Sequence, residues 1–130
     1  SSDLQDLVLG DGRLVYEAVG DLVQHWARES RGGRGWSAVG AVVGGTHPSQ
    51  ARQLRQRIPE VPFLIPGYGA QGATASDLQG LFGTDRVGAV VNSARAILYA
   101  HRTSEKPWLD AAREEAAAMR RALWEVSGGG

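Results

Sequence analysis

The sequence predicts an α/β fold, the carboxyl-terminal part of a (β/α)8 TIM barrel with about three parallel strands and four helices. Three apolar segments, at 36–45, 61–65 and 87–91, are uncharged and do not alternate with polar residues. Such segments are typical of parallel strands that are buried on both faces. A segment with helical spacing follows each of them, and this alternation indicates right-handed strand–helix units.

The first helix is expected over 13–29, because apolar residues recur there at spacings of three and four. Gly20 interrupts the pattern at a cost of about 1 kcal/mol relative to alanine. The glycine-rich loop 32–35 ends this segment. We expect the apolar face to lie in the core, and it consists of Val15, Ala18, Val19, Leu22, Val23 and Trp26.

The remaining helices follow the three strands in order. Thr46 is suited to cap a helix that Pro48 begins and Pro59 stops. A short helix capped by Thr74 or Ser76 is expected to end at Gly83, and a helical turn is expected over 96–100. The last helix is expected over 108–126, with Trp124 in the core. Residues 1–126 are thus assigned to the carboxyl-terminal half of a barrel domain and 127–130 to a flexible tail.

Composition narrows the classes of partner. The chain has 130 residues, 14 basic and 14 acidic, and no cysteine. Balanced charge argues against broad capture of nucleic acid or of a membrane surface, and no apolar run reaches the ~20 residues of a membrane span. The lack of cysteine fits the cytoplasm best. A complete barrel has eight units and about 250 residues, so we expect an amino-terminal half to be missing before Ser1.

The turn after the second strand is the first candidate binding element. The stretch PFLIPGYGAQG runs from Pro62 to Gly72, and its apolar run breaks off at Pro66. Three glycines, at 67, 69 and 72, allow close approach of the backbone to a ligand. Gln71 stands at the tip of the turn and can donate to a phosphate oxygen. The alternative is an ordinary glycine-rich turn with a solvated glutamine.

Arg95 follows the third strand and is the second candidate. Its planar guanidinium suits a phosphate, and parallel strands would bring it to the same edge as Gln71. The alternative is an ion pair with an acid on a neighbouring helix. Asn92 and Ser93 could orient Arg95 or contact a ligand, or they could satisfy backbone groups at the strand end.

Catalytic and metal-binding patterns are absent from the sequence. His25, His47 and His101 are dispersed, and each is expected to be structural or solvated. The single lysine, Lys106, lies in a loop, and no acidic residue falls at the carboxyl end of a strand. A binding half-site is therefore predicted, with no catalytic residue and no metal ligand in this chain.

Three stretches resemble the carboxyl-terminal half of orotidine 5′-phosphate decarboxylase, and the long-chain bacterial branch most of all. They are SSDLQDL, VGAVVGGTHPSQARQLRQRIPEVPFLIPGYGAQGA and GAVVNSARAILYA. The resemblance covers most of 1–100, whereas the final helix matches only in kind. It implies a homodimeric (β/α)8 barrel that converts orotidine 5′-monophosphate into uridine 5′-monophosphate and carbon dioxide without a cofactor.

The resemblance also implies roles for single residues. Gln71 and Arg95 would contact the substrate phosphate, assisted by backbone amides near Gly72 and Ala94, and Pro66 would line the wall near the pyrimidine. Ser1 and Ser2 would follow a loop that touches the base. The family's lysine–aspartate array has no match here and would lie in the missing half. Another phosphate-binding barrel enzyme, or a non-catalytic interaction fragment, remains the alternative.

Overall fold

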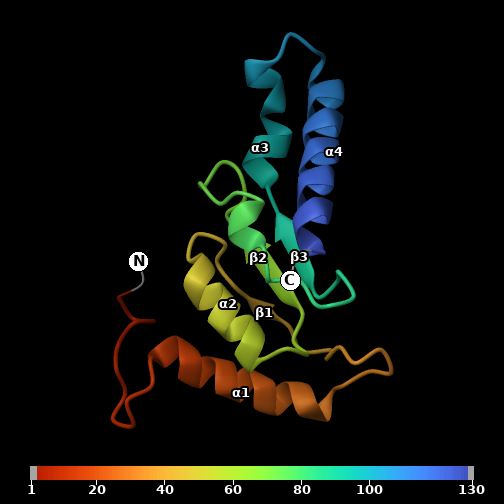
Figure 1. The fold of residues 1–130 in the computed structure, drawn as a ribbon. Coiled ribbons are helices and arrows are strands. Elements are labelled where there is room, and N and C mark those ends of the chain that lie inside the picture. Colours follow the sequence, from red (N-terminus) through yellow and green to blue (C-terminus); the bar gives the residue numbers. More distant parts are fainter. Residues whose placement is uncertain (1–2, 129–130) are drawn as a thin grey trace.

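The computed structural model describes residues 3–128, which form a three-stranded parallel sheet with the order β1-β2-β3 (Figure 1). The strands are β1 (Ala41–Val42), β2 (Phe63–Pro66) and β3 (Ala89–Asn92). The central strand β2 pairs with both neighbours, in the registers Ala41↔Phe63 and Phe63↔Ala89. The predicted parallel sheet is confirmed, and β1 is much shorter than the segment 36–45 that was assigned to it.

The described part of the chain has four α-helices. They are α1 (Val15–Glu29), α2 (Pro48–Arg57), α3 (Ala94–Leu98) and α4 (Trp108–Ser127). Two 3₁₀ turns, η1 (Ser76–Leu78) and η2 (Ala100–Thr103), complete the element order. Helices α3 and α4 run side by side beyond the end of the sheet (Figure 1). Among residues 3–128, no helix is long and apolar enough to cross a membrane.

Several local expectations were wrong at helix ends. His47 rather than Thr46 occupies the N-cap of α2, and its side chain makes no capping bond. The short helix expected after residue 74 is only the turn η1, because the Thr74 amide donates to the Asp77 carboxylate at 2.8 Å and closes a local loop. Ser127 belongs to α4 rather than to the tail. Ser1, Ser2 and the last two glycines lie outside the described residues.

The core lies between one face of the sheet and the helices. Phe63 and Ile65 of β2 and Val43, which directly follows β1, contribute to it with exposures of 1%, 0% and 6%. The remaining buried members come from the helices and from the connections between elements, and they are Ala27, Ala51, Ile58, Val61, Leu78 and Leu81. Period-two alternation along the strands therefore directs one set of side chains into this core.

The opposite face of the sheet is uncovered in this chain. Val42, Leu64 and Val90 are register partners across the three strands, and they are 71%, 44% and 66% exposed. Trp26 and Trp124 are also exposed, at 51% and 61%, so their assignment to the core was wrong. Parallel sheets are normally covered on both faces, and this uncovered row is what the interior of a barrel would present when its other strands are absent.

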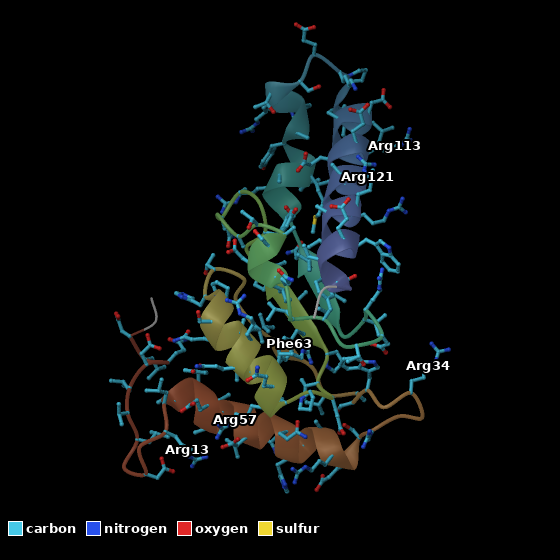
Figure 2. The ribbon with its side chains drawn as sticks, in the orientation of Figure 1. Arg13, Arg34, Arg57, Phe63, Arg113 and Arg121 are labelled. Carbon is cyan, nitrogen blue, oxygen red and sulfur yellow. The ribbon has the colours of Figure 1, made fainter. Side chains whose placement is uncertain are left out.

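An ion-pair cluster joins α1 to α2 (Figure 2). Asp21 accepts a hydrogen bond from Arg13 Nη1 at 2.6 Å and from Arg57 Nη2 at 2.8 Å. These bonds, that of Arg57 first, lower the pKa of Asp21 to about 2. Because a third or more of these side chains remains exposed, solvent screens much of the attraction.

We expect Asp21→Asn to lower the free energy of unfolding by about 1 kcal/mol at pH 7. The folded-state pKa lies below the unfolded one, so this stabilisation is present above about pH 4 and is lost as the pH falls toward 2. Urea unfolding at pH 7 and at pH 2.5 measures the difference. Asp110→Asn is the control, because Asp110 makes only an exposed contact of 3.7 Å with Arg113. A parent–variant difference that is the same at both pH values would contradict the prediction.

Candidate phosphate-binding site

The carboxyl ends of the three strands meet at one edge of the sheet. Pro66 is the last residue of β2, it pairs with Asn92 of β3, and its carbonyl accepts the amide of Gly45 at 3.1 Å. The backbones that follow β1, β2 and β3 therefore emerge together, which brings the two candidate segments to the same edge as predicted.

The turn after β2 owes its shape to its glycines. Gly67, Gly69 and Gly72 have φ values of 102°, 72° and 100°, in the left-handed region that favours glycine. The Gly72 amide donates to the Gly69 carbonyl and the Gly69 amide to the Ala73 carbonyl, both at 2.8 Å. The Gly72 amide is thus occupied within the turn.

Two neighbouring segments hold this turn in place. Ser93 is 5% exposed, and its hydroxyl donates to the Tyr68 carbonyl at 3.0 Å. Of the alternatives for Ser93, the structure shows the one in which it satisfies a backbone group. On the other side, a Cβ added at Gly67 would lie 3.4 Å from Gln71 Oε1 and 3.5 Å from Thr46 Cγ2. Gln71 consequently folds back over the turn toward Gly67, and Thr46 also lies beside this glycine.

Thr46 was predicted as a helix cap, and its position beside Gly67 at the start of the turn was missed. The sequence held one signal for this position. Thr46 directly follows the first predicted strand, in a glycine-rich segment like the one that follows the second predicted strand.

Arg95 lies in the first turn of α3, three residues after β3 ends. It is exposed, and no hydrogen-bond or ion-pair partner of its guanidinium is found among residues 3–128. The alternative of an ion pair with a neighbouring helix is therefore not realised in the described chain. Gln71, which is exposed, likewise has no hydrogen-bonded partner there. Two donor side chains of the predicted site are thus available to a ligand.

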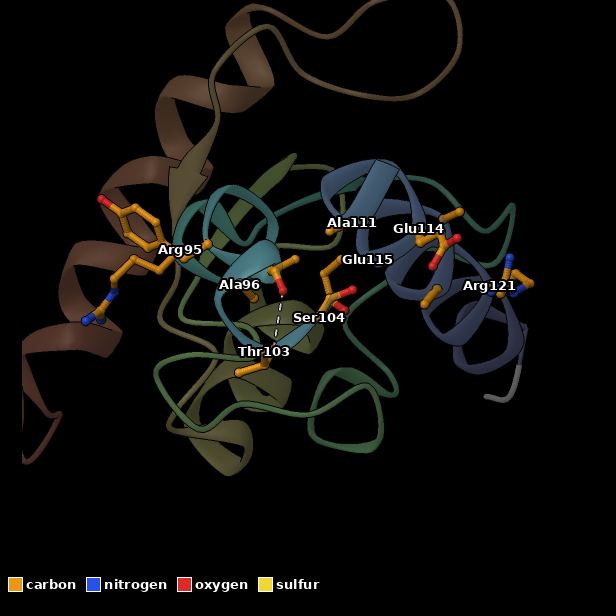
Figure 3. A pocket seen from close by; sticks show the side chains of 12 residues that line it. Arg95, Ala96, Thr103, Ser104, Ala111, Glu114, Glu115 and Arg121 are labelled. Atoms are coloured by element: carbon orange, nitrogen blue, oxygen red, sulfur yellow. Dashed lines mark hydrogen bonds between the residues drawn. The ribbon is translucent and has the colours of Figure 1, made fainter. Parts of the chain in front are cut away.

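A cavity of about 660 Å³ opens between α3 and α4 (Figure 3). Its lining includes Arg95, Ser104, Glu115 and Arg121, but neither Gln71 nor Pro66. Figure 3 shows the Arg95 side chain directed away from Glu114 and Glu115, on the other side of α3. This cavity therefore belongs to the helix pair rather than to the edge where Gln71 and Arg95 emerge.

Groups for acid–base or metal chemistry do not gather in the described residues. No cluster of three His, Asp or Glu side chains there could hold a metal ion. The single lysine, Lys106, binds Glu114 at 2.6 Å at the far end of the α3–α4 pair. Lys106 is therefore not part of the predicted site at the edge of the sheet.

Comparison with known proteins gives consistent matches. A protein from Clostridium perfringens named orotidine 5′-phosphate decarboxylase is 40% identical over 128 residues, which cover 97% of this chain and 44% of that protein. The chain is homologous to part of orotidine 5′-phosphate decarboxylase. A protein of the same name from Rhodopirellula baltica is 39% identical over 127 residues, which cover 92% of this chain and 42% of that protein. No protein-family model matches the chain.

Solved structures agree with the decarboxylase relatives. The structure of Leishmania donovani UMP synthase superposes on this chain with a TM-score of 0.68 at 33% sequence identity. The match covers 95% of this chain and 25% of the UMP synthase chain. The chain spans less than half the length of each of these proteins, in agreement with the carboxyl-terminal half that the resemblance implies. Its three strands and four helices are accordingly part of a TIM barrel.

We expect Gly69→Ala to destabilise the turn by about 1–2 kcal/mol, since a side chain at positive φ is strained. The added Cβ would also lie 3.3 Å from Ala96 Cβ and from Ser93 Oγ. Gly10→Ala is the matched control, because no atom lies within 4 Å of its added Cβ and its φ is not positive. Urea unfolding compares the two variants, and equal losses would contradict the role given to Gly69.

Proposed function

We propose that this chain forms the phosphate-binding part of an orotidine 5′-phosphate decarboxylase, which converts orotidine 5′-monophosphate into uridine 5′-monophosphate and carbon dioxide in pyrimidine synthesis. The observation that carries the proposal is Arg95, whose exposed guanidinium has no partner among residues 3–128 and which lies three residues after β3, beside the turn that presents Gln71. The homology supports the choice of reaction over other phosphate-binding barrels.

In this proposal Arg95 and Gln71 bind the phosphate of the substrate. Arg95 supplies charge-assisted hydrogen bonds, and Gln71 a neutral amide donor. The backbone amide of Ala94 assists, whereas the Gly72 amide already bonds the Gly69 carbonyl within the turn, and Pro66 lines the wall near the pyrimidine. Because the phosphate is remote from the carbon that loses carbon dioxide, its binding energy serves to orient the substrate.

Catalysis then requires residues that this chain does not supply. We place the lysine–aspartate array on the strands of an amino-terminal half, which would also cover the row Val42, Leu64 and Val90 and pair with the outer edges of β1 and β3. We further propose a cytoplasmic homodimer, as the resemblance implies. The chain alone should therefore bind the phosphate group without decarboxylating the substrate.

The test combines this chain with the part of the C. perfringens relative that it does not cover. The mixture is refolded, and loss of orotidine 5′-monophosphate is followed by absorbance. We expect turnover from the mixture and none from either part alone. A mixture that forms a stable complex, binds uridine 5′-monophosphate and yet shows no turnover would exclude the decarboxylase function.

Arg95→Ala should lower kcat/KM of the assembled protein roughly 30- to 150-fold, because charge-assisted bonds to the phosphate are lost. This corresponds to a loss of about 2–3 kcal/mol in transition-state stabilisation. Gln71→Ala should cost about 1 kcal/mol. Arg34→Ala is the control, because Arg34 is exposed and lies far from α3 (Figure 2). A value for Arg95→Ala within twofold of the parent would remove Arg95 from the site.

A further inference from the structure

Arg55 on α2 is a buried arginine whose partners are carbonyl groups. It is 7% exposed. Its Nε donates to the Leu81 carbonyl at 2.9 Å, and its Nη2 donates to the Gly88 carbonyl at 2.9 Å. Its Nη1 donates to the carbonyls of Val61 at 2.8 Å and of Pro59 at 3.2 Å. One side chain thus joins the segments that lead into β2 and β3.

Aromatic rings cover the guanidinium on its faces. The Arg55 Cζ atom lies 3.7 Å from the centroid of the Phe63 ring and 5.6 Å from that of Trp36. Among residues 3–128, no carboxylate forms an ion pair with it. Burial lowers the pKa of Arg55 to about 10, which leaves it charged at neutral pH. Four carbonyl dipoles and two aromatic faces therefore take the place of a counterion.

The Gly88 carbonyl has a second donor. The Phe63 amide also donates to it, at 2.8 Å, and this is the bond at the amino end of the β2–β3 ladder. Arg55 bonds in addition to Val61, two residues before β2 begins. The guanidinium fork therefore holds the amino ends of β2 and β3 at a fixed separation. Neither a single ammonium nor an apolar side chain could do this.

The register fixed at the amino ends of β2 and β3 determines how the segments at their carboxyl ends lie relative to each other. From Phe63↔Ala89 the ladder runs without a break to Pro66↔Asn92, after which the segments carrying Gln71 and Arg95 emerge. A shift by one residue would turn every side chain of a strand to the opposite face. We propose that Arg55 is a positioning residue for the phosphate site: it fixes the β2–β3 register and so places Gln71 relative to Arg95. The phosphate role itself rests on the proposed function.

Arg55→Lys tests this inference in the 130-residue chain, because it keeps the charge and removes the fork. Gly20→Ala is the control for general destabilisation, since its added Cβ would lie 2.9 Å from Leu54 Cδ2 at the α1–α2 contact. Hydrogen exchange of the Phe63 amide and the NMR shifts of the Gln71 and Arg95 amides are measured. We expect Arg55→Lys to speed Phe63 exchange at least tenfold beyond the control at matched stability, and to move both shifts.

Binding of uridine 5′-monophosphate and of uridine supplies a second readout. The affinity for the nucleotide should fall about fivefold to tenfold in Arg55→Lys, while the affinity for uridine stays that of the parent. If the parent binds both equally, the phosphate role fails, and the exchange and shift data still decide the positioning role. The positioning role would be overturned if Arg55→Lys and Gly20→Ala had equal effects on Phe63 amide exchange and on the two NMR shifts.

A measurement on the parent covers the case in which Arg55→Lys does not fold. If the Arg55 bonds and the ladder open together, the Arg55 Nε–H and the Phe63 amide must exchange with the same protection. An Nε–H that exchanges rapidly beside a protected Phe63 amide would show that the fork does not hold the ladder, and would overturn the inference.

Discussion

The parallel pairing of β2 with both neighbours is the constraint on which the rest of the structure depends. Because all three strands point the same way, the segments that follow them emerge at one edge, and each connection must return to the opposite edge. The first returns through the helix α2, and the second through a longer loop that contains only the turn η1. That geometry produces the buried face with Phe63 and Ile65. It also produces the meeting of the glycine turn with Ser93, although residues 68 and 93 are far apart in the sequence.

The parts of the fold that depend on local pattern could be predicted from the sequence. Apolar segments without alternation gave the strands, and the spacing of residues in 13–29 gave α1 to within two residues at its start. The glycines at 67, 69 and 72 were expected to shape the turn, and all three adopt positive φ. In each case the backbone preference of nearby residues decides the outcome.

The errors, and the points that the sequence left open, concern properties that the rest of the molecule decides. Periodicity places Trp26 on an apolar face, but it cannot show whether this chain contains anything to cover that face, and the ring is half exposed. The availability of Arg95 depends on which acids approach it in space. The role of Arg55 could not be predicted from its place in a charged helical segment. Its partners are the carbonyls of residues 59, 61, 81 and 88, which converge only in the folded state.

The uncovered row Val42, Leu64 and Val90 has a consequence for the colloidal behaviour of the chain. Apolar side chains stand beside the unpaired outer edges of β1 and β3, and a flat apolar surface with open edges is a template for strand addition by another molecule. The formal net charge at pH 7 is zero, so no long-range repulsion keeps copies apart. Purified alone and concentrated, the polypeptide is therefore prone to aggregate, and an added surplus of one charge sign on its exposed helices would counter this without touching the sheet.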